Sequence, residues 1–256
     1  MQNLKIIATD ISNIRKYGLC GYKDINKPGY KEKLRWLEKQ YEIGLKIKVL
    51  FSDESGTQGM IEYLPGEICW RPVQAAGFSF IHCLFVGFRR KYKNLGYGTK
   101  LIQNCLTEAR ENNLKGVAVV TRNGSFMAQK DIFLKSGFEI VDHAEPDFQL
   151  LVKKFDRIDK ELHFYNNWKE KLEQYQDGLY IVRADQCPYS VKNVHEIIKM
   201  AKNKFKIQPN LVNLKNYKQA QQSPLPFGTF GIIYNGKILA HHPISSKRFS
   251  NIMESR

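Results

Sequence analysis

The sequence has few of the features that mark secreted or membrane-bound proteins. Its 256 residues include only five cysteines, and this odd number without clustered spacing argues against a disulfide framework. It contains no apolar run of roughly 18 residues or more, the length that a spanning helix needs, and its first residues lack the long apolar region of a signal peptide. We therefore expect a protein that has no membrane segment and is located in the reducing environment of the cytoplasm.

Acidic residues are also scarce. The chain has 25 Asp and Glu against 40 Lys and Arg, which gives a formal net charge of +15. Such a balance suits nucleic acid, an anionic cofactor or an acidic partner, and we find no nucleic-acid motif. No acidic residue lies between Glu67 and Glu108, and the basic residues of this window are Arg71, Arg89, Arg90, Lys91, Lys93 and Lys100. The window favours an anionic cofactor, and we expect no nucleic-acid partner.

Hydrophobic periodicity predicts a mixed α/β fold. Antiparallel hairpins come first, then a strand–helix–strand unit, then a helix and two closing strands. The predicted strands of this part cover residues 3–7, 45–51, 59–64, 68–70, 78–86, 117–121, 138–141 and 148–155, and the predicted helices cover residues 31–43, 98–112 and 125–135. We place a first domain at residues 1–155, a connecting helix at 156–177 and a small second domain at 178–256.

The basic glycine loop at residues 87–99 follows a strand that is apolar enough to be central in a sheet. It ends in Lys93-Asn94-Leu95-Gly96-Tyr97-Gly98-Thr99 and opens directly into an amphipathic helix. A pyrophosphate needs several backbone N–H groups and a helix N-terminus behind them. Glycine allows the backbone to come close to such a ligand. The loop therefore has the composition of a pyrophosphate cradle.

This arrangement resembles the GNAT acetyltransferase family. That family has the motif Q/R-x-x-G-x-G/A between a central strand and a helix, and Lys93-x-x-Gly96-x-Gly98 fits it with Lys in the first place. Farther along, residues 133–139, Phe-Leu-Lys-Ser-Gly-Phe-Glu, look like the "lYeklGFe" segment that closes the acyl site of the family. The resemblance covers residues 1–155 and implies the GNAT acyl-CoA N-acyltransferase fold.

The resemblance also implies acetyl-CoA as the cofactor. The backbone of Leu84, Phe85 and Val86 is expected to pair with the pantetheine arm as an added strand would. The amides from Lys91 to Thr99 are expected to hold the pyrophosphate. The residues implied to bind the cofactor are Leu84, Phe85, Val86, Lys91, Lys93, Asn94, Leu95, Gly96, Tyr97, Gly98 and Thr99.

The family transfers the acetyl group by direct attack of a substrate amine, which must be neutral, so a general base is needed. Candidate bases are His82, on the central strand, and Glu62, on the preceding hairpin. A histidine in an apolar strand is also commonly a packed core residue. The family's frequent proton donor is a tyrosine where this chain has Phe133, and a phenyl ring cannot donate a proton. Another group or water then donates it, or catalysis is weak, or the domain only binds.

The second domain carries Cys187-Pro188-Tyr189-Ser190 between a predicted strand at 178–184 and a predicted helix at 191–205. A thiolate at a helix N-terminus is stabilised by the backbone dipole. The strand–helix–strand–helix–strand–strand–helix order resembles the thioredoxin-like fold, and the motif resembles a glutaredoxin site with Ser190 in place of the second cysteine. Without that second thiol, a dithiol cycle within the motif is not possible. No ligand spacing supports a metal site.

Together, a GNAT-like half and this C-terminal part resemble the YoaP-like family. The first hypothesis for function is an acetyl-CoA-dependent N-acetyltransferase that acts on a primary amine of a small molecule or peptide. The alternative is a catalytically weak acyl-CoA-binding or thiol-redox module that uses Cys187. The sequence indicates neither the acceptor nor the oligomeric state.

Overall fold

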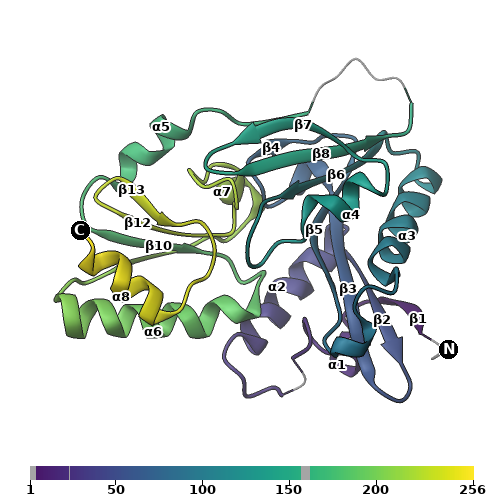
Figure 1. Cartoon of the computed structure of the whole chain (residues 1–256), viewed down its shortest axis with the longest axis horizontal. Coiled ribbons are helices and arrows are strands. Elements are labelled where there is room, and N and C mark those ends of the chain that lie inside the picture. The colour runs from purple at the N-terminus through teal and green to yellow at the C-terminus, as the bar shows by residue number, and fades with distance from the viewer. Residues whose placement is uncertain (1–3, 23, 157–161) are drawn as a thin grey trace. The chain divides into compact units, whose positions relative to one another are not determined.

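The computed structural model describes residues 4–22, 24–156 and 162–256, and Figure 1 labels most of their helices and strands. The chain forms two compact units. The first consists of Met1–Ile25, Leu34–Cys69 and Val73–Phe164, and the second of Asn26–Lys33, Trp70–Pro72 and Tyr165–Arg256. Two short segments from the first third of the chain therefore belong to the same unit as its C-terminal part.

The first unit is built on a mixed seven-stranded sheet. Its strand order is β1-β2-β3-β5-β6-β8-β7, with β5 and β6 parallel and the other neighbours antiparallel. This confirms the predicted mixed α/β fold. The sheet strands are β1 (Lys5–Thr9), β2 (Lys46–Ser52), β3 (Gly56–Pro65), β5 (Ser79–Val86), β6 (Gly116–Thr121), β7 (Glu139–Ala144) and β8 (Phe148–Lys154). A separate small pair joins β4 (Val73–Gln74) to β9 (His163–Phe164).

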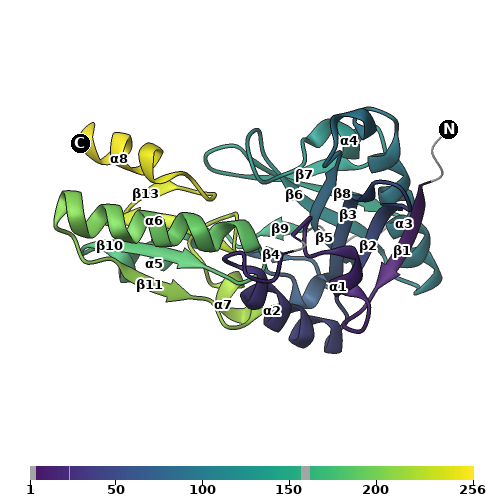
Figure 2. The same cartoon turned by 90° about the horizontal axis from the view of Figure 1, so that it is seen from below.

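The helices of this part are mostly short, and α3 is the longest. They are α1 (Ile14–Tyr17), α2 (Tyr30–Glu42), α3 (Tyr97–Glu111) and α4 (Lys130–Leu134), with single 3₁₀ turns at η1 (Gly66–Ile68) and η2 (Arg90–Tyr92). Figure 2 places α4 and residues 34–42 of α2 on opposite faces of the sheet. None of the described helices has both the length and the hydropathy needed to cross a bilayer.

Three predicted elements were wrong in type or extent. Residues 68–70 form no strand, because the 3₁₀ turn η1 takes up the chain after Pro65. The helix predicted at 125–135 begins only at Lys130, since Gly124 and Phe126 both have positive φ angles that interrupt helical geometry. The connecting helix predicted at 156–177 is reduced to α5 (Trp168–Leu172) and η3 (Glu173–Tyr175), and residues 157–161 lie outside the described ones.

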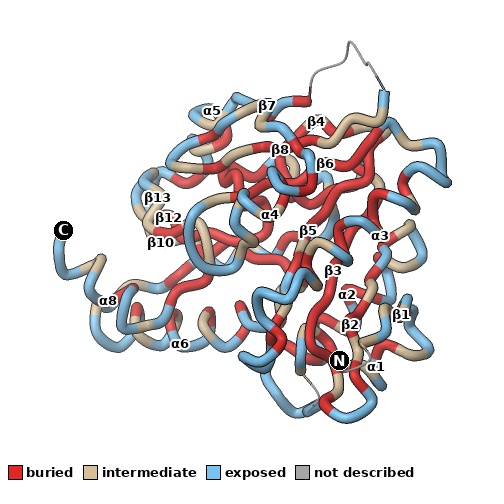
Figure 3. Tube along the Cα trace, turned by 45° about the vertical axis from the view of Figure 1, so that its right-hand side comes forward, coloured by how far each residue is buried: buried red, intermediate tan, exposed pale blue. Residues whose placement is uncertain are grey.

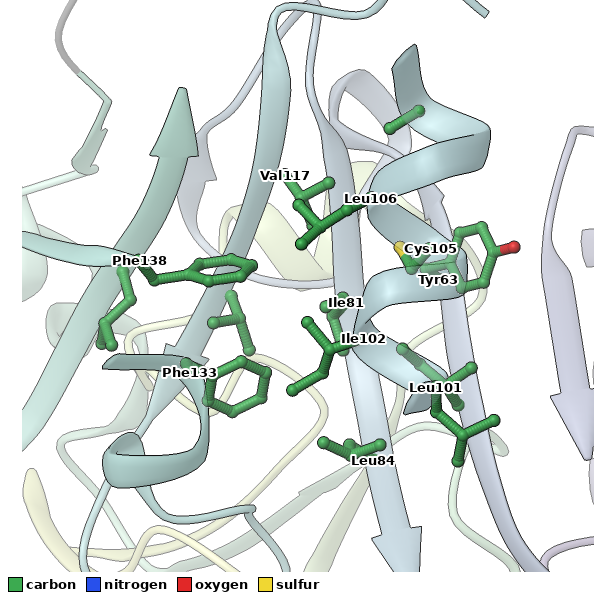
Figure 4. Close-up of a cluster of buried hydrophobic side chains, with 14 of the residues drawn as sticks. Tyr63, Ile81, Leu84, Leu101, Ile102, Cys105, Leu106, Val117, Phe133 and Phe138 are labelled. Carbon is green, nitrogen blue, oxygen red and sulfur yellow. The ribbon is translucent and has the colours of Figure 1, made fainter. Parts of the chain in front are cut away.

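The core of the first unit lies between the sheet and the α3–α4 face. Leu101, Ile102 and Cys105 of α3 are fully buried, and this stripe packs against the central strands (Figure 4). Figure 3 shows the same layering, with red inner strands and pale blue outer turns of the helices. Burying one such leucine or isoleucine side chain contributes roughly 1.5–3 kcal/mol, so this stripe fixes α3, and with it the loop before α3, against the sheet.

The second unit has a four-stranded sheet in the order β11-β10-β12-β13, in which only β10 and β11 are parallel. Its element order is strand–helix–strand–helix–strand–strand–helix, as the sequence predicts. The elements are β10 (Leu179–Arg183), α6 (Pro188–Phe205), β11 (Asn210–Asn213), α7 (Tyr217–Gln221), β12 (Phe230–Tyr234), β13 (Lys237–Ala240) and α8 (Ser246–Glu254). The helix predicted at 191–205 begins three residues earlier because Pro188 suits the first helical position.

A carboxylate network ties α3 to the sheet. Glu108 accepts hydrogen bonds from Lys46 and from the hydroxyl of Tyr63, the latter at 2.8 Å, and forms an ion pair with Lys48. Burial alone would raise the pKa of Glu108, but the hydrogen bonds from its partners outweigh it and lower the pKa to about 2. The charged form of Glu108 is therefore the form that stabilises the folded chain.

We expect Glu108→Gln to reduce the free energy of unfolding at pH 7 by roughly 1–3 kcal/mol. The folded-state pKa of Glu108 lies below its ordinary value of 4.5, so its contribution to stability is complete above about pH 4.5 and is lost as the pH falls toward 2. Urea unfolding at several pH values measures both effects. Glu111→Gln, on the exposed side of the same helix, is the matched control, and equal stability of the two variants at pH 7 would contradict the prediction.

Candidate functional site

The central strands β5 and β6 separate within the sheet. Their parallel pairing covers only Ser79–Ile81 against Val117–Val119, although β5 continues to Val86 and β6 to Thr121. On its other side β5 stays paired with β3 as far as Val86. On the β6 side, the backbone of residues 84–86 therefore has no strand partner among the described residues, and we call this break in pairing the gap between β5 and β6. An extended ligand can pair with such an edge as an added strand.

A β-bulge lies where the strands begin to diverge. In the β3–β5 pair, Glu62 is opposite Cys83 and Tyr63 is opposite Ile81, so His82 is the extra residue of the bulge. Bulges redirect side chains and are common beside active sites. The bulge at His82 interrupts the strict alternation of β5 at the position that the sequence singles out as a candidate base.

The two candidate bases, predicted separately, are brought together by this register. His82 Nδ1 lies 3.8 Å from Glu62 Oε1, and both side chains are almost completely buried. The distance is within ion-pair range but longer than a hydrogen bond. The ring of His82 also packs edge-on against Phe80 at a centroid distance of 5.6 Å. Glu62 alternates with Ile61 and Tyr63, which face the α3 core, so the pair lies on the opposite face of the sheet.

Two exposed aromatic side chains follow the pair along β5. Phe85 alternates with Leu84 and Val86, which pack on the α3 side, and its ring lies 4.6 Å from that of Phe88. A Cβ added to Gly21 would lie 2.6 Å from the Phe88 ring, so the loop after α1 packs closely on this ring. These rings extend the face that holds Glu62 and His82 toward the glycine loop.

The glycine loop ends in a helix N-terminus that no side chain caps. Gly96 is the N-cap of α3 in the left-handed conformation, and the first turn of α3 contains no acidic residue. The first helical bond runs from Lys100 N to Gly96 O, so the amides of residues 97–99 have no carbonyl partner within the helix. Uncapped amides at the start of a 15-residue helix favour an anion.

The space around the loop also fits a phosphate-bearing cofactor. A Cβ added to Gly96 would meet no atom within 4 Å, and Lys91, Lys93, Asn94 and Leu95 are exposed around it. Gly98 is also constrained by packing. A Cβ there would lie 2.5 Å from Ile132 Cδ1 of α4, so close packing of two helices already requires this glycine, whether or not a ligand is bound.

Phe133 is part of the core. It is fully buried, and its ring lies 5.5 Å from that of Phe138, edge to face. Figure 4 shows it in the same cluster as Ile102 of α3 and Leu84 of β5. The position of the family's usual tyrosine is therefore filled by an apolar packing residue. Tyr92, in the loop, is likewise buried.

Gln58 is a positioning residue that sequence reasoning missed. It is almost completely buried, and its amide donates to Ser55 O at 2.7 Å while its Oε1 accepts from Arg89 N at 3.3 Å. Its main-chain carbonyl accepts from Gly87 N at 2.7 Å. Gln58 thus anchors the start of the glycine loop to the β2–β3 hairpin. The sequence signal is a glutamine that precedes the apolar part of a predicted strand.

In the second unit, Cys187 is the N-cap of α6 and is partly exposed. Ser190, which replaces the second cysteine of the motif, is buried and donates its hydroxyl to Cys187 O at 2.7 Å. None of the five cysteines, all of which lie among the described residues, forms a disulfide. The described part of the chain holds no group of three or more His, Cys, Asp or Glu side chains placed for a metal.

Comparison with solved structures finds members of the GNAT class. An acetyltransferase of the GNAT family from Staphylococcus aureus Mu50 is 16% identical, covers 60% of this chain and 100% of its own, and gives a TM-score of 0.43. The GNAT family N-acetyltransferase YhbS from Escherichia coli was crystallised with CoA. It is 14% identical, covers 66% of this chain and 93% of its own, and gives a TM-score of 0.42.

Sequence comparison identifies a more specific likeness. The chain is 27% identical over 226 residues, 88% of its length, to 87% of the Bacillus subtilis (strain 168) protein named "Uncharacterized N-acetyltransferase YoaP". The family model described as YoaP-like matches residues 209–251. The predicted resemblance to a GNAT acetyltransferase with a YoaP-like C-terminal part is therefore confirmed, whereas the thioredoxin-like character of that part stays a prediction.

We expect Gln58→Leu, which keeps the size of the side chain, to loosen the start of the loop. Loss of the Arg89 hydrogen bond should speed amide exchange at residues 87–92 by about 5–10-fold, because one neutral hydrogen bond contributes about 1 kcal/mol. Hydrogen–deuterium exchange measures this directly. Gln103→Ala, an exposed glutamine on α3, serves as the control, and unchanged exchange in the Gln58 variant would show that the loop is held by other contacts.

Proposed function

We propose that this protein is an acetyl-CoA-dependent N-acetyltransferase that moves an acetyl group to a primary amine of a small molecule or peptide. The observation that carries the proposal is the gap between β5 and β6, which opens at Ile81–Val119 and is bordered by the uncapped start of α3. An acyl-CoA needs both features, one for its extended arm and one for its pyrophosphate. The likeness to an N-acetyltransferase over most of the chain supports the same reaction.

In this proposal, different groups of the chain bind the cofactor and transfer the proton. The backbone of Leu84, Phe85 and Val86 holds the arm, and the amides from Lys91 to Thr99 hold the phosphates, with Lys91 and Lys93 adding positive charge. The bound cofactor supplies the activated acetyl group. Glu62 and His82 take the proton that the attacking amine must lose, since they are the titratable pair at the bulge. Phe133 cannot protonate the departing thiolate, so water or another group does so.

We propose residues 1–155 as the acetyltransferase domain, residues 156–177 as a linker and residues 178–256 as a thioredoxin-like domain. The strand order β11-β10-β12-β13 with one parallel pair supports the last assignment. Five described cysteines without a disulfide support a reducing compartment such as the cytoplasm.

We expect Glu62→Gln and His82→Asn to lower kcat/KM for the amine by about 10²–10⁴-fold, as the loss of a general base does, while acetyl-CoA affinity stays within about twofold of wild type. Calorimetric titration with acetyl-CoA and CoA, followed by thiol-release assays over a panel of amines, separates binding from chemistry. His143→Asn, at an exposed position of β7, is the control. If neither ligand binds wild-type protein, the acetyl-CoA proposal is wrong.

The alternative function is a catalytically weak acyl-CoA-binding or thiol-redox module that uses Cys187. It is favoured by the apolar Phe133 at the usual acid position and by the place of Cys187 at the start of an 18-residue helix. Acetyl-CoA binding without turnover of any amine in the panel would support this second function over the first.

If Cys187 has a redox or thiol-binding role, alkylation against pH should give a thiolate pKa clearly below the ~8.5 of a free cysteine, because the N-terminal end of α6 stabilises the anion. Peptide mass spectrometry assigns the modified thiol, and Cys187→Ser provides the blank. A Cys187 thiol that reacts no faster than a free cysteine at neutral pH removes the redox alternative.

A further inference from the structure

Thr121 is a buried threonine whose hydroxyl has no hydrogen-bond partner among the described residues. It is fully buried at the end of β6, and its Oγ is unsatisfied. Other buried threonines of the same sheet behave differently. Thr9 donates to Ile47 O at 3.0 Å, and Thr57 donates to Tyr17 O at 2.6 Å. Because nearly all buried polar groups find a partner, the hydroxyl of Thr121 requires an explanation.

The position of Thr121 in the sheet suggests one. The β5–β6 pairing ends at Ile81–Val119, so Thr121 lies two residues beyond the point where the strands separate. Its strand pairs regularly with β8, Thr121 being opposite Gln149, so side-chain alternation holds along β6. Thr121 therefore points to the same face as Val117 and Val119.

That face packs against the cluster formed with α3 and α4. Val117 and Val119 belong to the apolar cluster that contains Phe133 and Leu84. A hydroxyl at the border of the gap, on an otherwise apolar face, is the arrangement by which binding sites fix the orientation of a mostly apolar ligand. The methylene segments of a pantetheine arm match the apolar residues, and its amide and thioester groups match the hydroxyl.

We propose that the hydroxyl of Thr121 is a hydrogen-bond partner of the acetyl-CoA arm in the gap between β5 and β6. The inference rests on the proposed function and adds a side-chain contact to a site otherwise built from backbone groups. Thr121 is a positioning residue in this proposal, because its hydroxyl orients the ligand and takes no part in proton transfer. The hydroxyl is covered by protein in the structure, so the ligand displaces neighbouring side chains to reach it. The hydroxyl then contributes one neutral hydrogen bond to the binding of the ligand.

Thr121→Val tests the proposal because it replaces the hydroxyl with a methyl group of similar shape. Without ligand, we expect the variant to unfold at the same temperature as wild type or higher, since an unsatisfied buried hydroxyl is lost. Its affinity for CoA and acetyl-CoA in calorimetric titration should fall by about 5–10-fold. Thr121→Ser, which keeps the hydroxyl, should bind both ligands within about twofold of wild type.

Thr57→Val is the matched control, because the same change there removes a hydroxyl that is bonded to Tyr17 O; it should lower the unfolding temperature. Wild-type affinity of Thr121→Val for both CoA and acetyl-CoA would overturn the proposal, whatever its stability. Failure of the wild-type protein to bind either ligand would instead overturn the proposed function, and this inference with it.

Discussion

The loss of pairing between β5 and β6 is the constraint on which the rest of the site depends. Seven described strands form one sheet, yet the parallel pair at its centre stops after Ile81–Val119. The bulge at His82 lies at this point on the other edge of β5, and a bulge bends and twists a strand locally. Bonding of β5 to β3 on one side, together with separation from β6 on the other, leaves a strand edge inside a sheet.

The sequence predicts the continuous elements of this arrangement well. β5 and β6 are almost uninterrupted apolar runs between turn residues, and α3 carries a clear apolar stripe, so composition and periodicity suffice. The separation of the strands could not be predicted in the same way, because no feature of residues 82–86 or 119–121 indicates where pairing stops. It results from register across three strands, and the same is true of the 3.8 Å approach of Glu62 to His82.

In the glycine loop, the two glycines of the motif are favoured for two different physical reasons. Gly96 takes a left-handed conformation with open space beside it, which fits the expected close approach of a ligand. Gly98 is required by the contact with Ile132 of α4, a constraint that links the loop to the segment containing Phe133. The glycine loop and the segment that contains Phe133, which are far apart in the chain, are therefore held together by packing. The hydrogen bond from Arg89 N to Gln58 also holds the loop in place, and neither motif includes Gln58.

Binding and chemistry therefore depend on different parts of the first unit. In the proposed function, backbone amides make most of the contacts to the cofactor, and their positions follow from the sheet, the bulge and the start of α3. Such contacts tolerate a change of side chain, as Lys93 in place of the motif's usual residue illustrates. Proton transfer depends on individual side chains, and Phe133 has become part of the core. A site of this construction can keep its cofactor while its chemistry varies, so the identities of Glu62 and His82 carry more information about the reaction than the fold does.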